Sequence, residues 1–243
     1  MAKVAVVIPA RYGSTRFPGK PLALIKGKPL VQRVLERIKQ CKNINLAAVA
    51  TDDQRIYDAV KGLGFEVFMT PETCKSGTDR IAFVAQKYLL DCDIFINVQG
   101  DEPLIDPALV DALASELLKN DSLECITAAF PISRKEDIEN PNIVKVVFDQ
   151  NGYALYFSRS PIPYNRDNGA HEYFKHIGIY GYKRDFVINF AKSPSTALEK
   201  AESLEQLRAL EAGKKIKVIK ALKDSIGVDS PSDIAKVERQ IKI

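Results

Sequence analysis

The stretch Val4-Ala-Val-Val-Ile8, followed by Pro9-Ala-Arg-Tyr-Gly-Ser-Thr-Arg-Phe-Pro-Gly-Lys20, decides the fold of this chain of 243 residues. The five apolar residues are mostly β-branched, a pattern typical of a strand buried on both faces of a parallel sheet. The loop after it contains two glycines, and apolar residues repeat at helical spacing from Pro29 to Gln40. A strand, a glycine-containing loop and a helix are therefore predicted in this order.

The same alternation continues outward from this opening unit. Further strands are predicted at 46–50, 66–69, 94–98 and 125–130, and helices at 56–63, 78–90 and 107–119. Such alternation predicts right-handed βαβ units and a mostly parallel sheet in an α/β fold. From about residue 142 the pattern changes, because 144–148 and 153–157 flank a turn with Asn151-Gly152, which predicts an inserted antiparallel hairpin.

The remaining third of the chain carries mixed signals. Residues 176–182 alternate in polarity, so His176 and Tyr180 should project from the same face of a strand. We expect a helix over 203–212 that begins with a capping box between Ser203 and Gln206 and ends before Gly213. A strand near 216–221 and a helix from about Ser232 complete the prediction. No linker or repeat divides the chain, which favours a single domain over 1–243 with an inserted sheet region.

Composition and charge exclude several classes of protein. The net charge of +4 is scattered, without the basic block or aromatic-interleaved stripe of a nucleic-acid surface. Four widely spaced cysteines, with no zinc-binding spacing, indicate reduced thiols: Cys41, Cys74, Cys92 and Cys125. The apolar run 4–8 is too short for a signal peptide or a membrane span, so we expect a cytoplasmic protein that does not insert into membranes.

The loop after the first strand indicates an anion site. It combines three cations with two glycines, namely Arg11, Arg16, Lys20, Gly13 and Gly19. Ligands of open α/β sheets bind at the carboxyl ends of strands, and cations with accessible backbone N–H groups suit a triphosphate. The loop is not a P-loop, because Pro21 stands where a Ser or Thr would hold magnesium. A solvated basic loop is the alternative interpretation.

The metal must then be held elsewhere. Asp101 follows the strand 94–98, and Asp229 lies in Ile226-Gly-Val-Asp229 near the far end of the chain. Two carboxylates with phosphate oxygens and waters suit Mg²⁺. Either aspartate alone is more often a helix cap or turn residue. The Asp-x-Asp sequence Asp91-Cys-Asp93 precedes its strand and should lie at the opposite end of the sheet, as a structural loop.

These residues resemble a known family, the 3-deoxy-manno-octulosonate cytidylyltransferases or CMP-Kdo synthetases. The resemblance spans nearly the whole chain. It is carried by the motifs Ile8–Leu22, Ser76–Arg80, Asn97–Pro103, Tyr156–Tyr164, His176–Tyr182, Glu202–Arg208 and Gly227–Asp229. The first motif is shared in looser form with other sugar nucleotidyltransferases, whereas the later ones are more specific. The resemblance implies a Rossmann-like, GT-A-like nucleotidyltransferase fold, a three-layer sandwich.

The resemblance also implies the reaction and the nucleotide site. The anomeric hydroxyl of Kdo attacks the α-phosphate of CTP and expels pyrophosphate, giving CMP-Kdo for lipopolysaccharide biosynthesis. Catalytic roles would fall to Lys20, Arg16, Asp101 and Asp229, with Lys20 stabilising the departing pyrophosphate and the two aspartates binding Mg²⁺. The CTP-binding residues would be Arg11, Arg16, Lys20, Ser76, Gly77, Arg80, Gln99 and Asp101.

The sugar side is implied to lie in the second half of the chain. The Kdo-binding positions would be Gln99, Arg159, His176, Tyr180, Glu205 and Gln206. Other interpretations stay open, because Tyr180 could pack between strands and Glu205 and Gln206 could form the wet face of a helix. The family suggests a homodimer, a nucleotide-binding part of about 1–130, and a sugar-binding and dimerisation part of about 131–243.

Three competing functions can be named. Another acidic sugar, such as a different 2-keto acid or an 8-amino relative of Kdo, could use the same phosphate loop. A catalytically silent sugar-nucleotide sensor would keep the cleft but lose metal or leaving-group contacts, which the presence of Lys20, Asp101 and Asp229 disfavours. A Ser/His/Asp hydrolase is disfavoured, because there is no G-x-S-x-G motif and His171 has the character of a surface loop residue.

Overall fold

The computed structural model describes residues 2–13, 17–167 and 169–241. Its described part contains a sheet of nine strands, in which the path β11-β7-β10-β6-β1-β4-β5 is extended by β8 and β9 beside β10. The strands on this path are β1 (Val4–Ala10), β4 (Leu46–Thr51), β5 (Glu66–Met69), β6 (Ile94–Asn97), β7 (Cys125–Pro131), β10 (Phe174–Lys183) and β11 (Lys217–Lys220). The added pair is β8 (Lys145–Phe148) and β9 (Ala154–Ser158).

The sheet is mostly parallel, as predicted. Strand β1 pairs in parallel with β4 and β6, and β11 pairs in parallel with β7. Strand β10 is the exception within the path, because it runs antiparallel to both β6 and β7. The predicted hairpin is present as β8 and β9, which pair antiparallel across the turn before Tyr153. The α/β fold class with an antiparallel insertion is thus confirmed.

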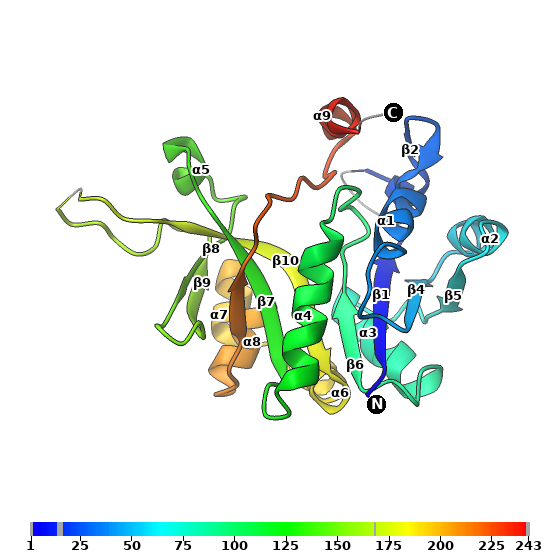
Figure 1. Cartoon of the computed structure of the whole chain (residues 1–243), viewed down its shortest axis with the longest axis horizontal. Coiled ribbons are helices and arrows are strands. Elements are labelled where there is room, and N and C mark those ends of the chain that lie inside the picture. Colours follow the sequence, from blue (N-terminus) through cyan, green and yellow to red (C-terminus); the bar gives the residue numbers. More distant parts are fainter. Residues whose placement is uncertain (1, 14–16, 168, 242–243) are drawn as a thin grey trace.

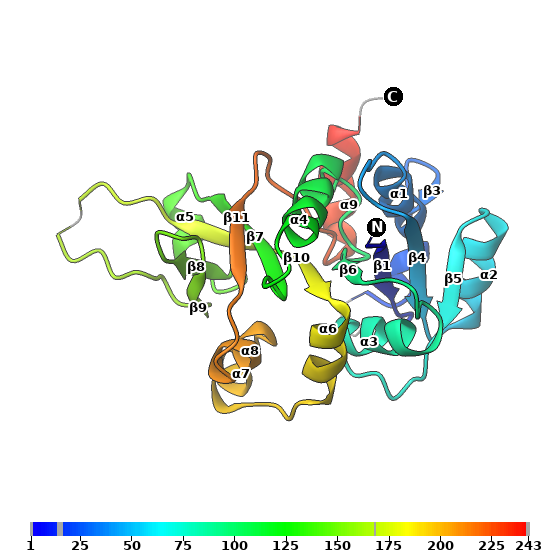
Figure 2. The same ribbon diagram turned by 60° about the horizontal axis from the view of Figure 1, so that its bottom comes forward.

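Helices cover both faces and make three layers (Figures 1 and 2). One core packs α1 (Leu30–Ile38), α2 (Gln54–Gly62) and α4 (Pro107–Lys119) against the sheet. The other packs α3 (Gly77–Lys87), α6 (Arg184–Lys192) and α8 (Gln206–Glu211) against the opposite face. Strand β1 lies between the two cores: Val4, Val6 and Ile8 belong to the first and Ala5 and Val7 to the second. Burial on both faces explains why this strand is a continuous apolar run.

The prediction for residues 203–212 is wrong at its start. Helix α7 (Ala197–Glu202) ends at Ser203, which takes a left-handed φ of 51°, and α8 begins only at Gln206. The N-terminal cap belongs to α7, where the Glu199 carboxylate accepts from the Thr196 backbone N–H at 3.2 Å. Ser203 therefore closes one short helix and does not open a longer one. The sequence pattern also missed α5 (Lys135–Glu139) and α6.

A chain segment that we call the strap, residues 222–230, leads from β11 across the molecule to α9 (Pro231–Gln240) (Figure 1). It meets the loop after β6 where the Val228 N–H donates to the Asp101 carbonyl at 2.8 Å. Val228 and Val237 of α9 are buried with Ile25 and Leu30 in a separate apolar cluster. This cluster fixes the strap beside the short strands β2 (Leu24–Ile25) and β3 (Lys28–Pro29). No helix in the described ranges is long and apolar enough to cross a membrane.

Candidate active site

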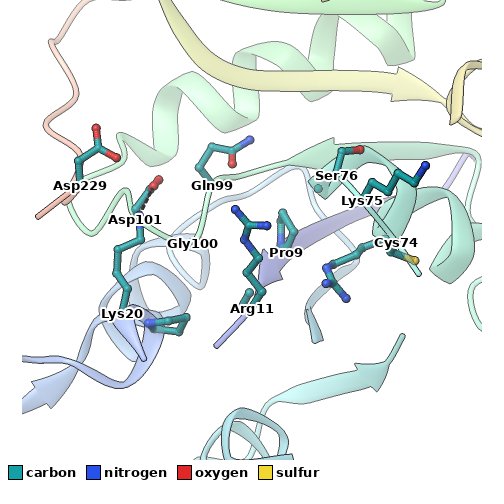
Figure 3. Close-up of a pocket in the computed structure, with 14 residues that line it drawn as sticks. Pro9, Arg11, Lys20, Cys74, Lys75, Ser76, Gln99, Gly100, Asp101 and Asp229 are labelled. Carbon is teal, nitrogen blue, oxygen red and sulfur yellow. Dashed lines mark hydrogen bonds and ion pairs between the residues drawn. The ribbon is translucent and has the colours of Figure 1, made fainter. Parts of the chain in front are cut away.

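A cleft of about 270 Å³ opens at the carboxyl ends of β1 and β6 (Figure 3). It brings together residues that the sequence separates widely, because parallel strands end at one edge of the sheet. Most of the residues predicted to bind CTP line it: Arg11, Lys20, Ser76, Gly77, Arg80, Gln99 and Asp101. Asp229 lines it too, from the strap. Arg16, also predicted there, lies outside the described residues.

Lys20 and Asp101 meet in this cleft. The Lys20 Nζ lies 2.7 Å from an Asp101 carboxylate oxygen, and their side chains are only 17% and 29% exposed. Figure 3 shows Lys20 extending toward Asp101, with Arg11 aimed at the space between Gln99 and Lys20. In this state the lysine charge is balanced by the aspartate. An anionic ligand that binds Lys20 must therefore compete with the Asp101 carboxylate for the ammonium group. Alternatively, it must bind together with a cation that pairs with Asp101 in place of Lys20.

The loop after β1 closes around Tyr12. The Gly19 N–H donates to the Tyr12 carbonyl at 2.9 Å, and the Arg55 guanidinium stacks on the Tyr12 ring at 3.3 Å. Gly19 has φ of 70°, and a Cβ there would lie 3.0 Å from the same ring. Glycine is needed for both reasons. Asp53 holds Arg55 through two hydrogen bonds of 2.9 and 2.6 Å, so α2 braces the loop.

The opposite wall of the cleft is the start of α3. Ser76 is the N-cap of this helix and forms a capping box with Asp79. Gly77 lies against the ring of Pro9, and a Cβ at Gly77 would lie only 3.0 Å from that ring. The buried Arg80 donates to Thr70 at 2.6 Å and to Asp52 at 2.5 Å. This network fixes the wall relative to the ends of β4 and β5.

Asp101 and Asp229 line the same cleft, as the metal prediction requires of them, although they come from different ends of the chain. A Cβ at Gly227 would lie 3.7 Å from the Asp101 carbonyl oxygen, so the strap runs close to the loop after β6. Ser225 donates to Glu102, whose pKa burial raises to about 8 with help from the neighbouring Asp101 charge. No group of three or more His, Cys, Asp or Glu residues suited to a metal occurs in the described residues. Two carboxylates beside a triphosphate do suit Mg²⁺, which draws several ligands from phosphates and water.

Gln99 connects the cleft to β10. Its side-chain N–H donates to the Gly178 carbonyl at 3.2 Å, and it also lines the cleft. Gly178 belongs to a bulge, because Ile177 pairs with Ala128 while Tyr180 pairs with the next residue of β7, Thr127. His176 and Tyr180 consequently project from one face with ring centroids 5.3 Å apart, as predicted.

A separate small cavity is lined by Tyr180, Glu205 and Gln206 among others. Glu205 accepts hydrogen bonds from Thr78 at 2.6 Å and from Arg208 at 2.8 Å. Gln206 is buried, so it is not part of a wet helix face, and its Nε2 has no hydrogen-bond partner in the described part of the chain. A buried amide donor of this kind is unfavourable unless a ligand accepts from it.

Arg159, by contrast, is held by backbone carbonyls. Its guanidinium donates to Glu202 at 2.7 Å, to Pro141 at 3.0 Å and to Ser203 at 3.4 Å. The Arg159 carbonyl in turn accepts from Lys145, a fully buried lysine whose ammonium also donates to two other backbone carbonyls. Within the described residues, Arg159 does not line the cleft at the ends of β1 and β6. These bonds use three of the five N–H donors of the guanidinium, and two remain for another acceptor.

Several site residues escaped the sequence patterns. Cys74 and Lys75 line the cleft from the loop before α3, Glu102 in the loop after β6 accepts from Ser225, and Thr127 of β7 contacts His176. Lys75 and Cys74 directly precede the Ser76-Gly77 motif, which was the available signal. Thr127 carried none, because one threonine in an apolar strand is common. Asp91 and Asp93 lie at the other end of β6, where they accept hydrogen bonds from Lys3 as the predicted structural loop.

Three comparisons place this site among known proteins. A family model described as cytidylyltransferase matches residues 5–216. The 3-deoxy-manno-octulosonate cytidylyltransferase of Geobacter sulfurreducens is 48% identical, over 98% of this chain and 99% of that protein. The 8-amino-3,8-dideoxy-manno-octulosonate cytidylyltransferase of Shewanella baltica is 50% identical, over 99% of each chain.

A solved structure agrees with these sequences. CMP:2-keto-3-deoxy-manno-octonic acid synthetase complexed with CTP is 44% identical and has a TM-score of 0.93, covering 98% of both chains. Identity at this level over the full length, with the same fold, goes well beyond the loose first motif. The chain belongs to the family of 3-deoxy-manno-octulosonate cytidylyltransferases.

Proposed function

We propose that this protein transfers CMP from CTP to the anomeric hydroxyl of Kdo, releasing pyrophosphate and giving CMP-Kdo for lipopolysaccharide biosynthesis. The observation that carries the proposal is the single cleft shared by Arg11, Lys20, Asp101 and Asp229. Gln99 of this cleft donates to Gly178 of β10, the strand whose Tyr180 lines a second, small cavity with Glu205 and Gln206. A cleft rich in cations suits a triphosphate, and the polar side chains on β10 and at the start of α8 suit the hydroxyls of a sugar.

The chemistry requires positioning and charge neutralisation, because the sugar hydroxyl can attack the α-phosphate without a covalent enzyme intermediate. Arg11, Arg16 and Lys20 would bind the phosphates, and Lys20 would neutralise the charge that grows on the leaving pyrophosphate. In the resting cleft Lys20 is paired with Asp101. Binding of the nucleotide would transfer Lys20 from that carboxylate to phosphate.

We propose Mg²⁺ as the cofactor, with Asp101 and Asp229 as its protein ligands. When bound, Mg²⁺ would lower the pKa of the sugar hydroxyl and offset charge on the α-phosphate. The support is the shared lining of the cleft by both carboxylates and the affinity of hard oxygen ligands for this ion. A bound cation would also replace Lys20 as the partner of Asp101, so the lysine and the metal have complementary roles.

The base and the sugar would lie on either side of the reacting phosphate. Ser76, Gly77 and Arg80 form the wall on which the cytosine would lie, where hydrogen bonds must distinguish its amino group from the carbonyl of uracil. Gln99, Arg159, His176, Tyr180, Glu205 and Gln206 would bind Kdo. Gln99 would contact both substrates, since it lines the cleft and reaches β10.

The test is pyrophosphate release from CTP and Mg²⁺ with Kdo, with an 8-amino relative of Kdo and with another 2-keto acid sugar. Release with Kdo, and competition by the others only at higher concentration, is expected. The comparison matters because relatives named for Kdo and for its 8-amino derivative are similarly identical to this chain. Release with another sugar but not with Kdo would refute the proposed substrate and leave the cytidylyltransferase family unaffected.

We further propose that the protein works as a homodimer in the cytoplasm and binds no nucleic acid. Exposed apolar side chains on the second half of the chain, Leu155 at 63% and Tyr164 at 87% exposure, support an interface there. All four cysteines are free thiols, consistent with a reducing compartment. The molar mass in solution, measured by light scattering, tests the dimer, and a Leu155→Asp variant should shift it toward 27.0 kDa.

A further inference from the structure

The hydroxyl of Thr127 lies among three polar groups. Its Oγ1 is 2.9 Å from the His176 Nε2, 2.7 Å from the Ile179 carbonyl and 3.3 Å from the Ile177 carbonyl. Thr127 itself is completely buried on β7. These contacts therefore set the donor and acceptor roles of the hydroxyl.

Counting hydrogens decides which atom donates. A threonine hydroxyl has one hydrogen and two lone pairs, and a carbonyl can only accept. If the hydroxyl hydrogen pointed at His176, the Ile179 carbonyl would face an oxygen lone pair at 2.7 Å, which is repulsive. The hydroxyl must therefore donate to a carbonyl, and the histidine must donate to the hydroxyl. His176 then carries its hydrogen on Nε2.

The bulge in β10 creates this arrangement. Gly178 and Ile179 lie between Ile177 and Tyr180, which pair with consecutive residues of β7. The extra residues let two carbonyls of β10 gather around one side chain of β7. The same bulge presents the Gly178 carbonyl to Gln99. One irregularity of the backbone thus orients two residues of the proposed sugar site.

The surroundings of His176 keep its ring uncharged. The Phe157 ring packs edge-on against it with ring centroids 5.1 Å apart, and the centroid of the Tyr180 ring lies 5.3 Å away. Burial lowers the pKa of His176 to about 3 and raises the pKa of Tyr180 well above its ordinary value. The His176 ring is then not available as a cationic partner for a sugar carboxylate near neutral pH.

We infer that Thr127 is a positioning residue that locks His176 as the neutral Nε2–H tautomer, so that the other ring nitrogen, Nδ1, accepts a hydrogen bond from a hydroxyl of the sugar. The inference rests on the proposed function for the identity of the sugar, but not for the tautomer. In this tautomer the Nδ1 of His176 can only accept, so it recognises a sugar hydroxyl that donates. The carboxylate of the sugar must then be bound by a cation elsewhere.

The tautomer can be measured directly without substrate. The chain has only two histidines, so a protein labelled with ¹⁵N-histidine gives two sets of ring signals, and a His171→Gln variant assigns them. We expect His176 to show a protonated Nε2 and an unprotonated Nδ1, unchanged between about pH 5 and 8. Thr127→Val should release this preference and Thr127→Ser should keep it. An Nδ1–H tautomer, or an unchanged tautomer in Thr127→Val, overturns the inference.

Kinetics test the second half of the inference. Thr127→Val should raise the KM for Kdo by about tenfold and leave the KM for CTP unchanged, whereas Thr127→Ser should restore the wild-type value. Kdo analogues in which single hydroxyls are replaced by fluorine identify the hydroxyl that Nδ1 accepts from. One analogue should bind to wild type more weakly than Kdo does, but should bind to Thr127→Val as well as Kdo does. Equal binding of all such analogues to wild type removes the role of Nδ1. Absence of any pyrophosphate release would instead refute the proposed function, while leaving the measured tautomer standing.

Discussion

Two regions of the proposed site differ in kind. The proposed phosphate end comprises Arg11, Lys20, Asp101 and Asp229, and the proposed sugar end comprises Arg159, His176, Tyr180, Glu205 and Gln206. At the phosphate end the charges lie on loops and the strap, partly open to solvent. At the sugar end Tyr180, Glu205 and Gln206 line a small cavity formed by β10 and the start of α8, and His176 is an uncharged ring beside them.

The difference follows from what each end must recognise. A triphosphate is identified by its charge, which flexible cations can meet in several geometries. A sugar is identified by the direction of each hydroxyl, which demands fixed donors and acceptors in a buried setting. Substitutions at the phosphate end should therefore change turnover, and substitutions at the sugar end should change affinity for one substrate. The predictions below test this division.

The largest effect is expected at Lys20. Lys20→Ala should lower kcat by about a hundredfold or more, because the charge that stabilises the leaving pyrophosphate is lost, while binding of Kdo changes little. Pyrophosphate release measures kcat, and calorimetry measures Kdo binding. The control is Lys28→Ala, a lysine of β3 whose ion pair with Glu36 lies away from the cleft. Wild-type turnover in Lys20→Ala would contradict the division.

Asp229 should come second. Asp229→Asn should raise the Mg²⁺ concentration for half-maximal rate by more than about tenfold, since one of two proposed protein ligands loses its charge. A Mg²⁺ titration at saturating CTP measures this. Asp224→Asn removes the same charge from the same strap, where the carboxylate pairs with Lys175, and should leave the titration unchanged. Equal Mg²⁺ dependence in both variants would remove Asp229 from the metal site.

Gln206 offers a test in which affinity and stability move in opposite directions. Gln206→Met keeps the shape of the side chain but removes a buried amide whose Nε2 has no described partner. We expect the free energy of unfolding to rise by about 1 kcal/mol and the KM for Kdo to rise by about tenfold, with the KM for CTP unchanged. Urea denaturation and steady-state kinetics measure the two. A destabilised variant with normal kinetics would make Gln206 a purely structural residue.

The smallest effect concerns pH. The pKa of His176 falls from 6.5 to about 3 on folding, because burial disfavours the charged ring. The unfolded chain then binds the proton more readily, so the free energy of unfolding should decrease as pH falls from 6.5 toward 3. A His176→Gln variant should show a shallower decrease over this window. Denaturation midpoints measured across the window compare the two chains, and identical slopes would contradict a histidine that folding keeps neutral.

The phosphate end was largely predictable from sequence. A buried strand followed by cations and glycines places ligand groups at the carboxyl end of a sheet, whatever the rest of the fold. The position of Asp101 followed from the same rule. Asp229 needed the resemblance as well, since nothing in Ile226-Gly-Val-Asp229 reveals a strap that crosses the molecule.

The sugar end was less accessible for physical reasons. His176 and Tyr180 were correctly placed on one face, but the bulge between them was not foreseen, because its cause is pairing with β7 and not local sequence. Ser203 is a residue type typical of an N-cap, yet it ends α7 in a left-handed conformation, and its carbonyl accepts from the distant Arg159. Thr127 and Lys145 act through buried contacts with the backbone, which leave no signature in a sequence.

The strap has a consequence for how the protein is made. Asp101 lies in the first half of the chain and Asp229 within the last fifteen residues. A ribosome that builds the chain from its N-terminus therefore exposes the phosphate loop long before the second carboxylate exists. Until the strap crosses the sheet and α9 packs on Ile25 and Leu30, a nascent chain has a cleft with only one of its two aspartates. The strap thus completes the cleft only after every strand of the described sheet has been synthesised.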